Sequence, residues 1–307
     1  MRAEELAHIA DDGAALFLRR WTPERAPRAV VQIAHGLAEH SGRYARLAGA
    51  LVAEGYAVYA HDHRGHGHTA PPGDLGFFAD RAGWGKCVGD IASLTRRIKM
   101  EHAGLPVALL GHSMGSFMAQ DYVARHGDML SALVLSGSNG APPAIAAAGR
   151  LIARVERLRL GPRGRSPLLK KLMFGDFNKP FKPARTDFDW LSRDAAEVDK
   201  YIADPLCGFD FSTQLAIDLL DALGELLGPE RLACIPRSLP VYVFSGARDP
   251  VGANIAGLIE TLRAAGLNVS SRLYPEGRHE MLNETNRAEV TADLIAFLDR
   301  ALARSHA

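Results

Sequence analysis

The stretch VALLGHSMGS, residues 107–116, joins an apolar run typical of a buried strand to the pentapeptide G-x-S-x-G, and a helical pattern follows it. In that setting the serine occupies a sharp bend between strand and helix, and its hydroxyl projects above the sheet. Gly111 and Gly115 leave room for the neighbouring backbone at the bend. The N–H groups that begin the following helix would face an oxyanion formed there. The stretch therefore predicts a nucleophile at Ser113 and disfavours a chance glycine-rich turn.

Short β-rich runs alternate with longer helical patterns on both sides of this stretch. Several of the runs are apolar throughout, as expected for a parallel sheet that is covered on both faces. The succession predicts an α/β fold with a doubly wound, mostly parallel sheet. The expected strands are residues 14–21, 30–35, 57–61, 106–110, 132–136, 241–245 and 269–274, and the expected helices are residues 44–54, 84–102, 117–125, 255–265 and 287–302.

This alternation stops between about residues 140 and 239, where the sequence is helical with Pro and Gly interruptions and has no strand pattern. Such a segment is either a separate helical domain or an insertion over one edge of the sheet. Strand patterns resume after it, which favours an insertion. We therefore expect a core built from residues 1–139 and 239–307, with residues 140–238 forming a helical cap and the return to the core.

A serine hydroxyl is a weak nucleophile at neutral pH, so it needs a general base, and the base needs an acid that orients it. Both are expected later in the chain, in loops at the carboxyl ends of strands. The strand pattern LPVYVFSGARD, residues 239–249, ends at Asp249, and VSSRLYPEGRHE, residues 269–280, leads to His279. The chain order Ser113, Asp249, His279 is the one that this architecture requires.

Other acidic residues are weaker candidates for the orienting acid. Asp218 and Asp221 lie inside a helical pattern, which offers no fixed loop position. Glu276 and Glu280 flank the histidine so closely that their side chains rarely face its ring. Asp249 therefore remains the expected acid.

An oxyanion hole requires two backbone donors. One is expected at the residue after the nucleophile, Met114. The other is expected in the loop after an early strand, and VVQIAHGLAEH, residues 30–40, leaves the Leu37 N–H free at that point.

Five segments, HGLAEHSGRY, DHRGHGHT, GHSMGS, GARDPVG and GRHEMLNE, together resemble the monoglyceride lipase and lysophospholipase group of α/β-hydrolases, which is often grouped with serine aminopeptidases. The resemblance extends from about residue 14 to the last helix and includes LSRDAAEVDKYIADPLCGF, which is similar to the family's return from cap to sheet. It implies an α/β-hydrolase fold with an inserted helical cap, a small acyl-ester substrate and no cofactor. It also implies a triad of Ser113, Asp249 and His279, with Leu37 and Met114 as oxyanion donors. Ser116 departs from the pattern, since many relatives have a third glycine there.

The stretch HDHRGHGHT, residues 61–69, contains four histidines and an aspartate, a set of ligands that zinc favours. Alternate residues at a strand end point to opposite sides, so His61 and His63 diverge from Asp62. Glycines within the stretch indicate a tight turn with little room for a fixed ligand set. We therefore expect no metal here, but a loop that supports the nucleophile turn, with Asp62 and Arg64 in local hydrogen bonds.

The expected cap begins with a strongly basic segment, residues 150–175, which holds eight Lys or Arg and only Glu156 as an acid. An apolar face recurs at helical spacing through Leu151, Ile152, Val155 and Leu158. Two interpretations stay open: a helix that roofs an acyl pocket and turns its cationic face to anionic lipid, or an ordinary solvated face on a packed helix. Aromatic residues later in the expected cap would suit a fatty-acyl ester as substrate. Carboxylates in the same segment could bind a substrate amine, so an aminopeptidase remains an alternative. The aromatic residues are Phe177, Phe181, Phe188 and Trp190, and the carboxylates are Asp187, Asp189 and Asp194.

The bulk composition excludes several classes of protein. The chain of 307 residues has 36 Lys+Arg against 35 Asp+Glu, so its net charge of +1 gives no argument for a nucleic-acid partner. Cys87, Cys207 and Cys234 lie far apart, which disfavours a disulfide framework and a zinc finger. We expect no signal peptide, and no apolar run approaches the ~20 residues that span a bilayer.

The sequence predicts a cytoplasmic serine ester hydrolase of small acylglycerols or lysophospholipids, with contact between the cap and lipid surfaces as a further hypothesis. The alternatives are an aminopeptidase or iminopeptidase, and a non-catalytic binding protein or receptor with the same fold. Acyl length, head group and oligomeric state are not indicated.

Overall fold

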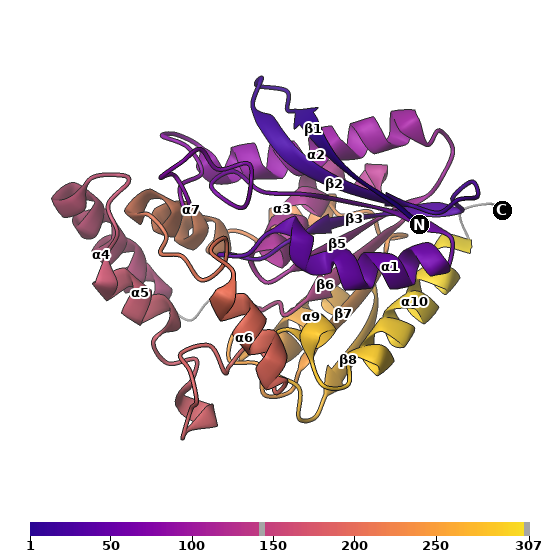
Figure 1. The fold of residues 1–307 in the computed structure, drawn as a ribbon. Coiled ribbons are helices and arrows are strands. Elements are labelled where there is room, and N and C mark those ends of the chain that lie inside the picture. The colour runs from indigo at the N-terminus through magenta and orange to yellow at the C-terminus, as the bar shows by residue number, and fades with distance from the viewer. Residues whose placement is uncertain (141–144, 304–307) are drawn as a thin grey trace.

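A computed structural model describes residues 1–140 and 145–303 of the chain (Figure 1). Its centre is an eight-stranded sheet with the strand order β1-β2-β4-β3-β5-β6-β7-β8. The first two strands run antiparallel to their neighbours, and the other six run parallel to one another. The strands are β1 (Arg2–Ile9), β2 (Ala15–Thr22), β3 (Ala29–Ala34), β4 (Tyr56–His61), β5 (Val107–His112), β6 (Ala132–Ser136), β7 (Pro240–Gly246) and β8 (Asn268–Tyr274).

Helices cover both faces of the sheet, which explains why its central strands are apolar on both sides. Every residue of β3, β4, β5 and β6 is buried. Neighbouring residues of one strand serve opposite faces: Leu109 belongs to the core on one face and Leu110 to the core on the other. The first face packs against α2 (Gly83–Glu101), α3 (Met114–His126) and α9 (Ile255–Ala264), and the second against α1 (Ala45–Ala53) and α10 (Arg287–Ala303).

The expected α/β architecture is confirmed, with element bounds that differ by a few residues from the sequence predictions. One strand was not predicted. β1 pairs along its whole length with β2 at the edge of the sheet, and most of its residues are exposed. Because an exposed edge strand buries little, its sequence RAEELAHI carries no apolar run that would indicate a strand.

The segment between β6 and β7 contains helices and, within the described residues, no strand. Its α4 and α5 lie together at the left of Figure 1, on the side away from the N-terminus. α7 packs against both α4 and α2, so the segment is anchored on the core. The helices are α4 (Ile145–Leu160), α5 (Pro167–Phe174), α6 (Ala195–Ala203), α7 (Thr213–Leu223) and α8 (Pro229–Cys234).

Three of the four side chains of the apolar face predicted for α4 are exposed. Leu151, Val155 and Leu158 are 65%, 54% and 83% exposed, while Ala153 and Glu156 are buried. Glu156 is accommodated because its carboxylate accepts hydrogen bonds from Arg159 and from the Ser166 hydroxyl. The helix therefore packs through Ile152, Ala153 and Glu156 and leaves Leu151, Val155 and Leu158 exposed.

Candidate active site

Ser113 lies between the last residue of β5 and the first residue of α3, as the sequence predicts. Its backbone angles, φ 52° and ψ −121°, belong to a region that side chains other than glycine rarely adopt. A Cβ at Gly111 would overlap the carbonyl oxygen of Gly115, and one at Gly115 would overlap that of Ala34. Both glycines are therefore required by the close approach of three backbone segments around the serine.

Asp249 and His279 form a buried pair in the loops that follow β7 and β8. The imidazole Nδ1 lies 3.0 Å from both carboxylate oxygens of Asp249. The carboxylate also accepts hydrogen bonds from the Ser245 hydroxyl and the Val251 N–H, each at 2.8 Å. These bonds fix the carboxylate, which in turn fixes the orientation of the ring and leaves Nε2 as its free nitrogen.

The electrostatics of the pair suit a general base. Burial alone would raise the pKa of Asp249, but the neighbouring His279 and the hydrogen bonds hold that pKa below its ordinary value. Burial alone would lower the pKa of His279, but the Asp249 carboxylate raises it above its ordinary value. The aspartate is therefore ionised at neutral pH, and the histidine is stabilised when it takes up a proton.

The candidate nucleophile and base each contact the backbone at the end of β6. Ser136, which precedes Gly137, accepts a hydrogen bond of 2.9 Å from the Ser113 N–H. A Cβ at Gly137 would lie 2.9 Å from His279 Cε1, so the imidazole lies against this backbone. Within the ranges that the structure describes, the Ser113 hydroxyl has no hydrogen-bond partner, so its contact with the imidazole remains a prediction.

The predicted oxyanion donors lie at the same edge of the sheet. The loop after β3 carries Leu37, and a Cβ on its neighbour Gly36 would lie 3.2 Å from Ser113 Cβ. The loop is held by a hydrogen bond of 2.5 Å from the Gly36 N–H to the Glu39 carboxylate. In the described part of the chain, no hydrogen bond occupies the N–H of Leu37 or of Met114. Both N–H groups are therefore free to bind an oxyanion.

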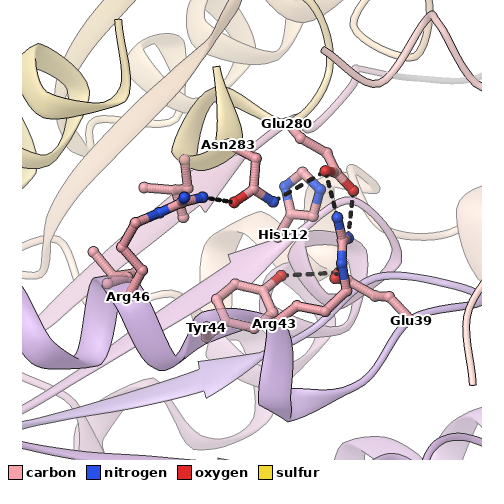
Figure 2. A pocket seen from close by; sticks show the side chains of 9 residues that line it. Glu39, Arg43, Tyr44, Arg46, His112, Glu280 and Asn283 are labelled. Carbon is pink, nitrogen blue, oxygen red and sulfur yellow. Dashed lines mark hydrogen bonds and ion pairs between the residues drawn. The ribbon is translucent and has the colours of Figure 1, made fainter. Parts of the chain in front are cut away.

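A buried charge network supports this edge of the sheet (Figure 2). Arg43 donates two hydrogen bonds to the Glu280 carboxylate, at 2.5 and 2.7 Å, and a third to Glu39 at 2.9 Å. Glu39 also accepts a bond from the Tyr44 hydroxyl. Burial would raise the pKa of Glu280, but Arg43 lowers it to about 2. The network lines a cavity of about 20 Å³ that also touches His112.

The sequence did not predict this network. The sequence favours Asp249 over Glu280 as the partner of His279, and in the structure the Glu280 carboxylate binds Arg43. Glu39 and Arg43 stand four residues apart in HGLAEHSGRY, which indicates a local pair. No local pattern indicates that Glu280, 237 residues from Arg43, completes it.

The chain around residue 190 holds the candidate base in place. The N–H groups of His279 and Glu280 donate to the carbonyl oxygens of Trp190 and Leu191, at 3.3 and 2.7 Å. The ring of Trp190 lies against the imidazole, with centroids 5.0 Å apart. The helical segment between β6 and β7 therefore contacts the catalytic edge directly.

Two of the carboxylates that could bind the substrate amine of an aminopeptidase bind other residues of the protein instead. Asp194 begins α6 by accepting a bond from the Ala196 N–H, and it pairs with Arg287 at 2.7 Å. Asp189 accepts a bond of 2.6 Å from the Thr186 hydroxyl. These contacts weaken the case for a site that holds a substrate amine.

Some ring nitrogens of the histidines in residues 61–69 have hydrogen-bond partners, while His61 Nδ1 and His66 Nε2 are buried and have none among the described residues. His63 pairs with His61 at 3.1 Å and with the carbonyl oxygen of His35 at 3.2 Å, while His66 faces the carbonyl oxygen of Arg64. The side chains of Asp62 and Arg64 make hydrogen bonds as predicted, but only the bond between Asp62 and His68 is local, and Arg64 binds distant segments. Asp62 accepts bonds from the N–H groups of Ser41 and His68, and Arg64 donates to Asp12 and Asp90.

One cluster in the described residues, His40, Asp204 and Cys207, brings three metal-ligand types within 4.8 Å of one another. His40 Nδ1 accepts a bond from the Gly42 N–H at 3.2 Å, and Nε2 lies 2.9 Å from the Asp204 carboxylate. Both ring nitrogens thus have partners already, so an ion would have to displace one of them. The cluster fits a hydrogen bond between two loops better than a metal centre.

The strained serine at a strand–helix bend, the later histidine–aspartate pair and the mostly parallel sheet define an α/β-hydrolase. The predicted fold class is thereby confirmed. The chain belongs to the family described as serine aminopeptidase, S33, whose sequence model matches residues 25–286.

Several known proteins are similar over nearly the whole chain. Monoacylglycerol lipase of Mycolicibacterium smegmatis is 32% identical over 280 residues, which cover 91% of this chain and 90% of that protein. Monoglyceride lipase of Homo sapiens is 30% identical, over 92% of this chain and 85% of that protein. The crystal structure of a carboxyl esterase from Bacillus coagulans in complex with glycerol has a TM-score of 0.90 at 29% identity and covers 98% of this chain and 99% of that one. The chain is a serine ester hydrolase of the monoglyceride lipase type.

Proposed function

We propose that the enzyme cleaves carboxylic esters of small acylglycerols or lysophospholipids through an acyl-enzyme intermediate on Ser113. The observation that carries this proposal is the buried His279–Asp249 pair, and it is supported by the strained bend at Ser113 and by two backbone N–H groups that have no partner in the described residues. The carboxyl ends of the parallel strands β3, β5, β7 and β8 meet at one edge of the sheet, which is why residues from four loops converge there.

The proposed reaction follows from this arrangement. His279 Nε2 takes the hydroxyl proton as Ser113 attacks the ester carbonyl, and Asp249 stabilises the imidazolium that forms. The N–H groups of Leu37 and Met114 bind the developing oxyanion. The imidazolium then protonates the leaving alcohol. A water molecule, activated by the same base, hydrolyses the acyl-enzyme.

An acyl substrate is supported by a row of aromatic side chains that starts at the base. Trp190 lies against His279, and Phe177 lies against Trp190 with ring centroids 4.9 Å apart. Phe174 continues the row at 5.3 Å from Phe177. This row leads from the catalytic edge into α5, and it offers an apolar wall along which a fatty-acyl chain would lie.

Residues 140–238 act, in this proposal, as a cap between the core segments 1–139 and 239–307. No helix in the described part of the chain is both long and apolar enough to cross a membrane. The exposed side chains of Leu151, Val155 and Leu158 form a surface through which the cap would touch a lipid layer. The basic residues around them would favour anionic lipids. The test is co-sedimentation with anionic vesicles, and binding that survives Leu158→Asp would contradict this contact.

The direct test of the proposed activity compares p-nitrophenyl esters of several acyl lengths, monoacylglycerols, lysophospholipids and amino-acid naphthylamides. The wild-type enzyme is expected to turn over the esters, and Ser113→Ala is expected to lower that turnover by at least about 10⁴-fold. Faster turnover of the naphthylamides would favour the aminopeptidase alternative. Inertness toward both classes would favour a binding protein with this fold.

A further inference from the structure

A chain of three buried polar side chains ends at the peptide that carries one of the proposed oxyanion donors. Ser116, in the first turn of α3, lies 2.6 Å from the Ser113 carbonyl oxygen. Its hydroxyl is 2.8 Å from that of Ser138, which in turn is 2.9 Å from Gln120 Nε2. None of Ser116, Ser138 and Gln120 is more than 4% exposed. None of these three side chains is a member of the proposed triad.

The direction of these hydrogen bonds follows from the number of protons. The Ser113 carbonyl can only accept, so the single hydroxyl proton of Ser116 is donated to it. The contact between the two hydroxyls must then use the proton of Ser138. The Ser138 oxygen is left to accept from the amide of Gln120. Every bond in the chain therefore points toward the Ser113 carbonyl.

That carbonyl belongs to the same peptide unit as the Met114 N–H. It also accepts bonds from the N–H groups of Ser116, at 2.8 Å, and Phe117, at 3.2 Å. Donation to a peptide oxygen draws electron density from the N–H of the same unit, so the N–H becomes a stronger donor, and hydrogen bonds in a chain reinforce one another. The hydroxyl of Ser116 adds a third donor to the two that the helix supplies.

We propose that Ser116, with Ser138 and Gln120 behind it, is a positioning residue that holds the strained bend at Ser113 and strengthens Met114 N–H as an oxyanion donor. This inference rests on the proposed function.

Gln120 offers a way to separate this role from simple stability. Its Oε1 is buried and has no partner among the described residues, and its side chain borders an apolar cavity shared with Leu226 and Val241. Gln120→Met would remove an unpartnered polar atom and fill apolar space, so it is not expected to lower the melting temperature. It would nevertheless remove the first donor of the chain.

The expected effect is modest but measurable. Loss of a whole oxyanion donor lowers kcat by about 10²–10³, and one polarising bond changes the strength of its neighbour by roughly 10–30%. If Ser116→Ala or Ser116→Gly removes about 10–30% of the logarithm of that 10²–10³ loss, kcat falls by about two- to eightfold. Gln120 is separated from Ser116 by Ser138, so the effect of Gln120→Met on kcat is smaller and in the same direction.

The test measures kcat and KM on a p-nitrophenyl ester, and the inhibition constants of an alkyl boronic acid and of a fatty acid. The boronic acid forms a tetrahedral anion on the serine, whereas the fatty acid reports ground-state binding. For Ser116→Ala and Gln120→Met we expect a lower kcat, an unchanged KM, weaker boronate inhibition by the same factor, and unchanged fatty-acid inhibition. Ser93→Ala is the matched control, because Ser93 is also a buried helical serine and its hydroxyl lies 3.0 Å from His8, away from the Ser113 peptide.

Wild-type kcat and boronate affinity in Ser116→Ala would overturn the inference. The inference would also be overturned if the losses of kcat and boronate affinity followed the losses of melting temperature. In that case Ser93→Ala would lose as much activity as Ser116→Ala, and Gln120→Met would lose none. Failure of the proposed function is a distinct result, since the wild-type enzyme itself would then hydrolyse no acyl ester and bind no boronate at Ser113.

Discussion

Arg43→Met should destabilise the protein far more than a surface substitution of the same kind. The Arg43 side chain is 11% exposed and is bonded to Glu280 and Glu39, which are 7% and 4% exposed. The methionine would leave these two carboxylates facing each other without a cation. Because Glu39 also accepts the Gly36 N–H, the oxyanion loop would lose part of its support.

The magnitude follows from the burial of the network. Removal of one partner of a buried ion pair costs about 3–5 kcal/mol. At ~2.1 cal/mol/K per residue, unfolding of a chain of 307 residues has an entropy of about 0.65 kcal/mol/K. The melting temperature should therefore fall by about 5–8 °C. Arg46→Met is the matched control: Arg46 pairs with Glu197 but is 44% exposed, so its loss should cost at most about 1 kcal/mol.

The pH dependence sharpens this prediction. In the wild-type protein Arg43 lowers the pKa of Glu280 to about 2, below the ordinary value of 4.5, so this stabilisation is present above pH 4.5 and is lost as the pH falls toward 2. Without Arg43, burial raises the pKa of Glu280 above its ordinary value. The deficit of Arg43→Met should therefore shrink as the pH is lowered from 8 to 5. Urea unfolding followed by circular dichroism measures the loss of stability. Equal losses in Arg43→Met and Arg46→Met, or a loss that does not change with pH, would show that the buried network contributes no more than a surface ion pair.

Three further predictions concern the catalytic edge. Asp249→Asn should lower kcat by about 10⁴-fold and, since Asp249 raises the pKa of His279, should move the acidic limb of the pH–rate profile to lower pH; an acidic limb at the wild-type pH would contradict this. Gly115→Ala should prevent formation of the bend, because its methyl would overlap the Ala34 carbonyl oxygen; an active, folded variant would count against the assigned backbone geometry. Trp190→Ala should raise KM for a long-chain ester more than KM for an acetyl ester. Phe188→Ala is the control, because the Phe188 ring lies against Tyr201, and it should leave the ratio of the two KM values unchanged. Equal effects of the two substitutions would contradict an acyl wall at Trp190.

The features that sequence reasoning predicted well are local or follow from a simple topological rule. The bend at Ser113 is encoded within ten residues, and the loops that carry Asp249 and His279 were expected at one edge because parallel strands end together there. The structure pairs Asp249 with His279, while the contact of the imidazole with Ser113 stays a prediction. The fold class needed only the alternation of strands and helices.

The features that were missed depend on contacts between distant segments. Arg43 and Glu280 each look like an ordinary charged residue in the sequence, and only the fold brings them into one buried network. The periodicity of α4 correctly indicated an apolar face but not which side is covered, because its small Ala153 permits close packing while Leu158 faces outward. β1 is held mainly by pairing with β2, which leaves no apolar signature.

The most direct test of the catalytic assignment is covalent labelling with a fluorophosphonate, followed by peptide mapping of the wild-type enzyme, Ser113→Ala and His279→Ala. We expect one label per chain on Ser113, no labelling of Ser113→Ala, and labelling of His279→Ala slowed by orders of magnitude, because the imidazole held by Asp249 must remove the serine proton. A label on a different residue, or an unchanged rate without His279, would contradict it.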